Sequence, residues 1–153
     1  MKTRNLATLA VAAIGAMLSF AAVAAAENIR GTQGDDVLAG TDADDHIVAK
    51  QGNDQASGGL GNDSLKGNKG DDSLAGDDGD DTLSGNKGAD ALDGGFGNDT
   101  INALGDGKKS GPDTITCGEG TDTVRADAND VVAEDCETVD RPGKKKPGKP
   151  PKG

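Results

Sequence analysis

The sequence predicts an all-β fold in which short strands stack into one flattened coil, and two observations support that prediction. The first is a nine-residue repeat, because eight units run from Gly31 to Asn102 without an insertion. The second is composition: the chain has 25 Gly and only two aromatic residues, Phe20 and Phe96. A short period in a chain with few large side chains is typical of a stacked array rather than of an ordinary globular core.

Five columns of the repeat keep their phase through all eight units, counted from Gly31 as position one. Positions one and four are Gly except at Ala49 and Ala43, and position five is Asp or Asn except at Ala89. Position eight is apolar throughout: Leu38, Ile47, Ala56, Leu65, Leu74, Leu83, Leu92 and Ile101. Position six is always Asp: Asp36, Asp45, Asp54, Asp63, Asp72, Asp81, Asp90 and Asp99.

Each column has a physical meaning. Gly at positions one and four permits a tight turn and close backbone approach. Three residues around position eight, such as Thr82-Leu83-Ser84, predict a short strand with one inward side chain. Two units then close a coil of 18 residues, and successive coils stack about 4.8 Å apart. Aspartates 18 residues apart, such as Asp36 and Asp54, are therefore expected to lie above one another.

The charge of the repeat region requires a counter-ion. All 27 acidic residues lie between Glu27 and Asp140 with eight basic residues, which gives this region a formal charge of −19. Such a segment is expected to be disordered unless a cation neutralises it. The same charge argues against a nucleic-acid-binding core, and the composition argues against an enzyme with a deep apolar pocket.

Calcium is the cation that these residues favour. Carboxylate oxygens and the carbonyls of Gly-rich turns are the ligands that Ca²⁺ prefers. Mg²⁺ requires tighter octahedral geometry, and Zn²⁺ prefers Cys or His, which the turns lack. The sequence therefore predicts Ca²⁺ between carboxylates of neighbouring coils.

The repeat resembles the RTX-type (haemolysin-type) calcium-binding nonapeptide GGxGxDxUx, most closely in Gly58–Lys66 and Gly94–Asn102. The resemblance implies a right-handed parallel β-roll, a form of β-helix or solenoid, with calcium in its turns. It also implies that position-six aspartates two units apart share an ion, which gives about six sites, with help from carbonyls near positions two and four. The ligands so implied are the eight position-six aspartates together with Gly34, Gly52, Gly61, Gly70, Gly79, Gly88 and Gly97.

Some units depart from this pattern. Position two is Gly only at Gly59 and Gly95, so the other turns are expected to carry more strain. Ala56 predicts the weakest core layer. Proteins of this family usually carry a separate effector domain, for which this chain has no room, so toxin, protease or lipase activity is not predicted.

His46 is the one histidine and is expected to be solvated rather than catalytic.

The N-terminal residues 1–26 predict a secretory signal peptide. Lys2 and Arg4 precede an apolar, Ala-rich run that ends in small residues, with cleavage expected after Ala26 or, as second choice, after Ala24. The alternative is a retained transmembrane anchor, since the run is long enough to span a bilayer. Cleavage would make the protein extracellular, with residues 27–30 as a short lead-in to the repeats.

The C-terminal part predicts a cap and a tail. Residues 103–140 contain a phase break and then degenerate repeats, the last of them around Asp130 and Val132. Cys117 and Cys136 are expected to form a disulfide in an oxidising compartment. Residues 141–153 form a basic tail rich in Pro, Gly and Lys, which is either a solubilising end or an electrostatic attachment to anionic wall polymer or membrane.

The function expected from the sequence is that of a secreted, monomeric, non-enzymatic protein that folds when it binds calcium. The principal alternative is a calcium-stiffened adhesion or matrix protein anchored by its basic tail. A second is one component of a larger effector system. Nucleic acid is not an expected partner.

Overall fold

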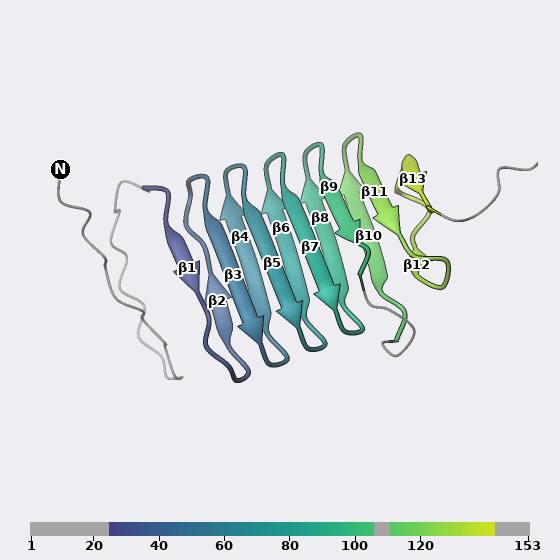
Figure 1. The fold of residues 1–153 in the computed structure, drawn as a ribbon. Coiled ribbons are helices and arrows are strands. Elements are labelled where there is room, and N and C mark those ends of the chain that lie inside the picture. Colours follow the sequence, from purple (N-terminus) through teal and green to yellow (C-terminus); the bar gives the residue numbers. More distant parts are fainter. Residues whose placement is uncertain (1–24, 106–110, 143–153) are drawn as a thin grey trace, which may run out of the picture.

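The computed structural model describes residues 25–105 and 111–142, which form thirteen strands in two parallel sheets (Figure 1). The chain passes from one sheet to the other with every strand, so it makes a parallel β-solenoid of about six turns. The seven-stranded sheet contains β1 (Asn28–Arg30), β3 (His46–Gln51), β5 (Ser64–Lys69), β7 (Thr82–Lys87), β9 (Thr100–Ala103), β11 (Thr123–Ala126) and β13 (Thr138–Asp140). The six-stranded sheet contains β2 (Val37–Ala39), β4 (Gln55–Leu60), β6 (Ser73–Asp78), β8 (Ala91–Phe96), β10 (Thr114–Glu119) and β12 (Val131–Val132).

The register confirms the 18-residue coil. Leu65 lies beside Leu83 and Leu74 beside Leu92, each 18 residues apart, on adjacent strands of one sheet. The phase break after Asn102 is absorbed without loss of pairing, because Thr100 lies beside Thr123. The described residues form no helix, so none of them could cross a membrane as one.

Most strands are longer than the sequence predicts. β7 covers six residues instead of three, because it continues through positions one to three of the next unit. Position one is therefore an inward-facing strand residue, as buried Gly85 shows, and not the start of a turn. Positive φ occurs instead at positions two and four, for example at Asn86 and Gly88. Glycine at position one leaves space inside the roll, although Ala49 and Cys117 show that a side chain fits there in some units, and glycine at position four provides the positive φ found from Gly52 to Gly97.

The core is one layer of inward side chains between the sheets. The position-eight residues from Ile47 to Ile101 are all buried, and Ile115 and Val124 continue the layer into the C-terminal part. Ala56 is also buried, with an exposed fraction of 6%, so the smallest member of the column still contributes to the core. Each unit thus contributes one buried apolar side chain at position eight, so the core is thin.

The roll begins before the first predicted unit. Residues 28–30 form β1, which pairs with β3, and Ile29 packs against the core. Ile29 occupies position eight and Glu27 position six of a partial unit before Gly31, so the repeat phase itself could have indicated this strand.

The C-terminal cap agrees with the expected degenerate repeats. Val132 on β12 lies beside Ile115, as the one-residue slip predicts. Cys117 and Cys136 form the predicted disulfide, with their Cα atoms 5.2 Å apart. Cys117 occupies position one, where earlier units have Gly or Ala, and is fully buried. The bridge therefore lies inside the roll, where it ties the last coils to the cap.

Two predicted segments lie mainly outside the described residues. These are the signal peptide, of which residues 1–24 are not described, and the basic tail from residue 143 onward. Arg141, the first predicted tail residue, is described, and its guanidinium donates hydrogen bonds to the carbonyls of Asp127 and Asp130. Arg141 therefore contacts the cap.

Candidate metal centre

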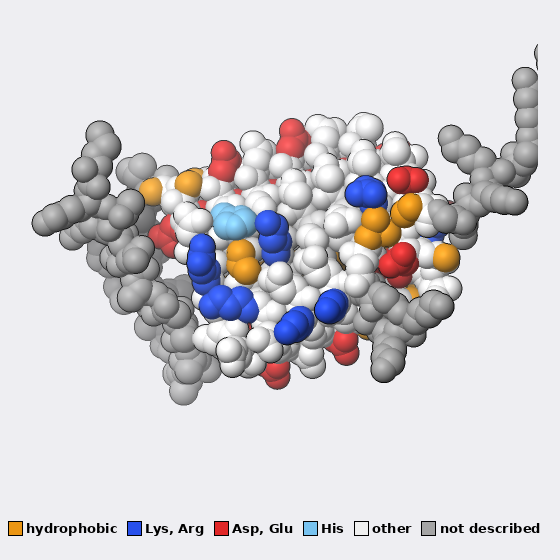
Figure 2. All heavy atoms as spheres, in the orientation of Figure 1, with side chains coloured by type: hydrophobic (Ala, Val, Ile, Leu, Met, Phe, Trp, Pro, Cys, Tyr) orange, Lys and Arg blue, Asp and Glu red, His pale blue; other side chains and the backbone are white. Residues whose placement is uncertain are grey.

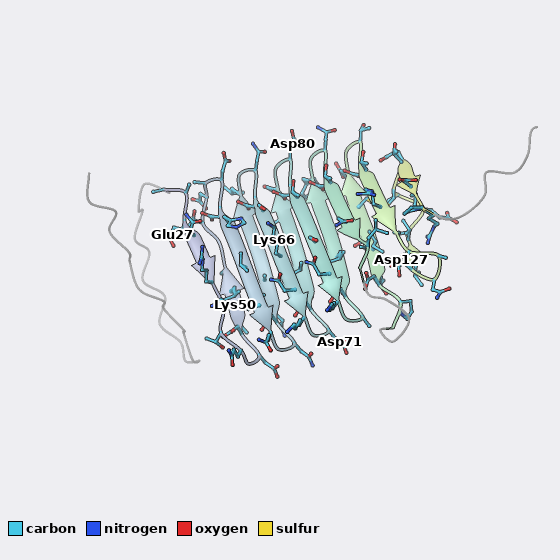
Figure 3. The ribbon with its side chains drawn as sticks, in the orientation of Figure 1. Glu27, Lys50, Lys66, Asp71, Asp80 and Asp127 are labelled. Carbon is cyan, nitrogen blue, oxygen red and sulfur yellow. A yellow bond between two sulfur atoms is a disulfide. The ribbon has the colours of Figure 1, made fainter. Side chains whose placement is uncertain are left out.

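The position-six aspartates form two buried rows, one along each edge of the roll. The turns from odd to even strands hold Asp54, Asp72 and Asp90, and the turns from even to odd strands hold Asp63, Asp81 and Asp99. Figure 3 shows the two edges through the neighbouring position-five residues Asp71 and Asp80, which lie at opposite ends of the strands. All of these position-six side chains are at most 2% exposed. Each follows a Gly-rich turn that brings it back toward the interior.

Each buried carboxylate contacts the previous coil through one oxygen. The backbone N–H of Asp63 donates to Oδ1 of Asp81 at 2.6 Å, and the N–H of Asp81 donates to Oδ1 of Asp99 at 2.8 Å. The same bond joins Asp36 to Asp54, Asp45 to Asp63, Asp54 to Asp72 and Asp72 to Asp90. The predicted stacking is thus present, and it runs through backbone amides.

The second oxygen of several of these carboxylates has no hydrogen-bond donor. Among the described residues, Oδ2 is buried and without a hydrogen bond in Asp54, Asp63, Asp72, Asp81, Asp99 and Asp122. A buried acceptor without a donor is costly, and it is costlier still when it carries charge. These oxygens have the environment expected of atoms that ligate a cation.

A main-chain carbonyl lies close to this oxygen. At Gly58, the point where a Cβ would lie is closer than 3.0 Å both to Oδ2 of Asp63 and to the carbonyl oxygen of Gly76 on the next coil. Gly76 has the equivalent two neighbours one coil further along, Oδ2 of Asp81 and the carbonyl of Gly94. Two acceptors that converge on one small space match the oxygen chemistry of a Ca²⁺ site.

The buried aspartates also hold protons more tightly than ordinary carboxylates. Burial raises the pKa of Asp72 and of Asp81 to about 7, an effect that the backbone hydrogen bonds partly offset and neighbouring aspartates increase. The pKa values of Asp54, Asp63 and Asp99 are raised for the same main reason. Burial thus makes the unneutralised anions unfavourable, and a bound divalent ion would remove that penalty.

The first two units differ from the others. The N–H and hydroxyl of Thr41 both donate to Oδ2 of Asp45, and Thr32 makes the same two bonds to Asp36. These two aspartates were predicted as ligands on equal terms with the rest. Threonine at position two, where the family pattern has Gly, instead gives their second oxygen a protein partner.

The position-four glycines have a packing role. The carbonyl of Gly61 points at the Cα of Gly79 on the next coil, where φ is 137° and a side chain would collide with that carbonyl. The carbonyl of Gly52 lies against Gly70 in the same way. At Gly58 and Gly76 the carbonyl that lies against the same space as the Asp Oδ2 belongs to position one, and the ligand carbonyls near positions two and four stay a prediction.

A second, exposed ladder runs beside the buried one. The N–H of Asp80 donates to Oδ1 of Asn62 at 2.8 Å, so the position-five side chain contacts the next coil and not the previous one. Ala89 interrupts this ladder, and the register aligns it with Pro112, which has no N–H to satisfy. The sequence contained the Asp/Asn column, but only the register explains its one exception.

The aspartate rows extend beyond the predicted ligands. Asp113 and Asp122 are fully buried, and their Oδ1 atoms accept the N–H groups of Asp90 and Asp99. Asp130 and Glu137 continue the rows by accepting the N–H groups of Asp113 and Asp122. Asp113 and Asp122 kept the repeat phase, so the sequence could have included them, but Glu137 carries no such signal.

No three Asp, Glu, His or Cys side chains of the described residues converge as a cluster that could hold a metal ion. An ion between coils would therefore need main-chain carbonyls as well as carboxylates, as the geometry at Gly58 suggests. His46 lies half-buried on β3.

A family model described as the RTX calcium-binding nonapeptide repeat, in four copies, matches most of the chain. Its overlapping matches cover residues 23–56, 30–65, 48–83, 57–92, 66–101 and 109–132. No curated protein and no solved structure matches the chain.

Proposed function

Because the chain belongs to the RTX calcium-binding nonapeptide repeat family, we propose that it is a secreted, non-catalytic β-roll that folds on binding several Ca²⁺ ions along its two aspartate rows. The repeats of this family bind calcium, and the stacked aspartates fit that role. The proposal adds three points to family membership: coupling of binding to folding, the identity of the ligands, and secretion.

The observation that carries the proposal is the buried, donor-less Oδ2 in successive coils. In Asp63 and Asp81 this oxygen faces the same small space as a carbonyl of the next coil, which supports a site built from a carboxylate and a carbonyl oxygen. The N–H bond to Oδ1 already fixes the carboxylate orientation. About six ions would bring twelve positive charges against the −19 of this region and remove most of its self-repulsion.

Calcium-coupled folding follows from the thin core. Backbone ordering costs about 1–2 kcal/mol per residue, whereas one Leu or Ile per nine residues contributes only about 1.5–3 kcal/mol. The unpaired carboxylates add to the deficit. A chain that is unfolded without metal would remain export-competent in a calcium-poor cytoplasm and fold outside the cell.

Circular dichroism in chelator and in millimolar Ca²⁺, together with calorimetric titration, tests this coupling. We expect a disordered spectrum in chelator, a β spectrum in calcium, about six bound ions, and little response to Mg²⁺. A β spectrum that persists in chelator, or an equal response to Mg²⁺, would contradict the proposal.

A contact of the Glu27 backbone nitrogen supports cleavage of the signal peptide after Ala26. The backbone nitrogen of Glu27 lies 2.6 Å from Oδ1 of Asp45, which is only 4% exposed. Cleavage after Ala26 would place a positive α-ammonium against that carboxylate, whereas cleavage after Ala24 would leave a neutral amide. We therefore expect the intact mass of the exported protein to begin at Glu27, and a mass that retains residues 25–26 would refute this assignment.

A further inference from the structure

The two sheet faces of the roll carry opposite charge. The strands of the seven-stranded sheet bear six basic residues, Arg30, Lys50, Lys66, Lys69, Lys87 and Arg125, and one acidic residue, Asp140. The strands of the six-stranded sheet bear Asp77, Asp78, Asp93 and Glu119 and no basic residue. In a region of net charge −19, nearly every described cation thus lies on one face.

Four of the basic residues lie along two lines of this sheet, Arg30 and Lys66 at position nine and Lys69 and Lys87 at position three. Figure 2 shows Lys and Arg side chains gathered on the N-terminal half of this face, with acidic side chains along the edges and toward the C-terminal end. Lys69 and Lys87 lie directly beside each other on β5 and β7, whereas Lys50 on β3 lies beside Asn68 and its ammonium group donates a hydrogen bond to the carbonyl of Gly31. Lys66 and Arg30 occupy position nine on alternate strands. Adjacent strands are about 4.8 Å apart, so Lys69 and Lys87 present closely spaced positive charge, while Val48 lies between Arg30 and Lys66.

This arrangement is not explained by stability. Like charges directly opposite each other on neighbouring strands are destabilising. The ion pair found among the described residues joins Arg125 to Asp140, at the other end of the face. Lys66, Lys69 and Lys87 are exposed and make no ion pair with a described carboxylate. Their charges are therefore available to an external anion.

We propose that the N-terminal half of the seven-stranded face binds an extended acidic polysaccharide that lies along the roll axis. Hydroxyl and amide side chains lie on the same strands as the cations, with Ser64 beside Thr82 and Asn68 beside Asn86. Such groups hydrogen-bond to sugar hydroxyls, while the lysines meet the anionic substituents as point charges.

Other anionic partners fit this face less well. Its strands carry no Phe, Tyr or Trp on which a base could stack, and the one imidazole, that of His46 on β3, is half-buried, which argues against nucleic acid. Protein interfaces are depleted of Lys at their centres, which argues against a protein partner. The exposed large apolar side chains of the described residues lie outside the basic half, where half-buried Val48 is too small to anchor a bilayer.

The test compares three full-length proteins in saturating Ca²⁺, each first shown to be folded by circular dichroism. They are the unmodified chain, the variant K66Q/K69Q/K87Q, and the control Q55E/S73E/T114E. The control makes the same three-unit change in net charge at exposed positions of the six-stranded sheet. The probe is dextran sulfate, with neutral dextran of equal length as the reference.

We expect the unmodified chain and the control to bind dextran sulfate in a salt-dependent way and to ignore dextran. The lysine variant should bind roughly 10- to 100-fold more weakly, with a salt dependence reduced by two to three charges. No binding by the unmodified chain, or equal weakening in both variants, would overturn the proposal. Tighter binding to an oligonucleotide or to anionic vesicles would overturn its assignment to polysaccharide. Because folding is verified first, these outcomes are independent of the calcium experiment.

Discussion

At the scale of single residues, neighbouring aspartates of one turn have opposite environments. Asp81 is 1% exposed, and its Oδ2 has no hydrogen bond, whereas Asp80 is exposed and forms part of the outer ladder. Both are Asp in the sequence, and both lie in a loop that a motif search would treat as one acidic cluster. Only the buried member has the environment of a metal ligand.

Replacing Asp81 with Asn tests this distinction. Asn keeps the Oδ1 acceptor for the N–H of Asp63 but removes the charge, so calcium binding should suffer more than the stacking of the coils. We expect the sites shared with Asp63 and Asp99 to lose at least about tenfold in affinity, measured by calorimetry.

The matched control is Asp80→Asn, the same chemical change one residue earlier. It should leave calcium affinity within about twofold of the unmodified chain, because an exposed charge contributes little. If the two variants bind calcium equally well, the buried row is not the calcium site.

At the scale of one strand and its turn, glycine has two different uses. Gly58 at position one faces inward, where Oδ2 of Asp63 and the carbonyl of Gly76 occupy the space of a side chain. Gly34 at position four, in the first turn, has open space where its Cβ would lie. The glycines of the repeat therefore differ widely in how well they would tolerate replacement by a residue with a side chain.

Gly58→Ala is expected to damage the roll and its calcium site together. The added methyl would lie between a carboxylate oxygen and a backbone carbonyl, neither of which can move freely, and the expected loss is about 2–4 kcal/mol. A lower urea midpoint in saturating calcium and a weaker calcium titration would show it. Gly34→Ala is the control and should be within about 0.5 kcal/mol of the unmodified chain. If Gly58→Ala were equally neutral, the convergence of the two oxygens at Gly58 would have no energetic importance.

At the scale of the whole molecule, the two ends of the roll are closed differently. The N-terminal end relies on hydrogen bonds from Thr32 and Thr41 to the first aspartates, while the C-terminal end uses Asp130, Glu137 and the buried disulfide. Because terminal coils of a stacked array lack a neighbour on one side, each end needs such a device.

Removing the disulfide should therefore loosen the C-terminal end of the calcium-bound roll. In the chain-entropy model, a bridge across about 20 residues contributes on the order of 3 kcal/mol. The double variant Cys117→Ala, Cys136→Ala is expected to have a lower urea midpoint in calcium while keeping its β spectrum. An unchanged midpoint would mean that the cap is stable without the bridge.

Much of the fold could be predicted because the repeat makes it a local property. The nine-residue period, the inward column from Ile47 to Ile101, the stacking of Asp63 under Asp81 and the bridge between Cys117 and Cys136 were all predicted and are present. The first three depend only on spacing along the chain, which recurs in every unit, whereas the bridge was predicted because the chain has only two cysteines.

Other features depend on contacts between coils, so the order of residues alone did not reveal them. The sequence by itself determined the period, the apolar column and the acidic rows, since a repeated local pattern can close in few ways. Tertiary structure decided that strands run on through position one, that Thr41 satisfies Asp45 while Oδ2 of Asp63 stays without a donor, and that the cations share one face. The physical reason is that each of these outcomes is set by a neighbour about 18 residues away or by the alternation of units between two sheets.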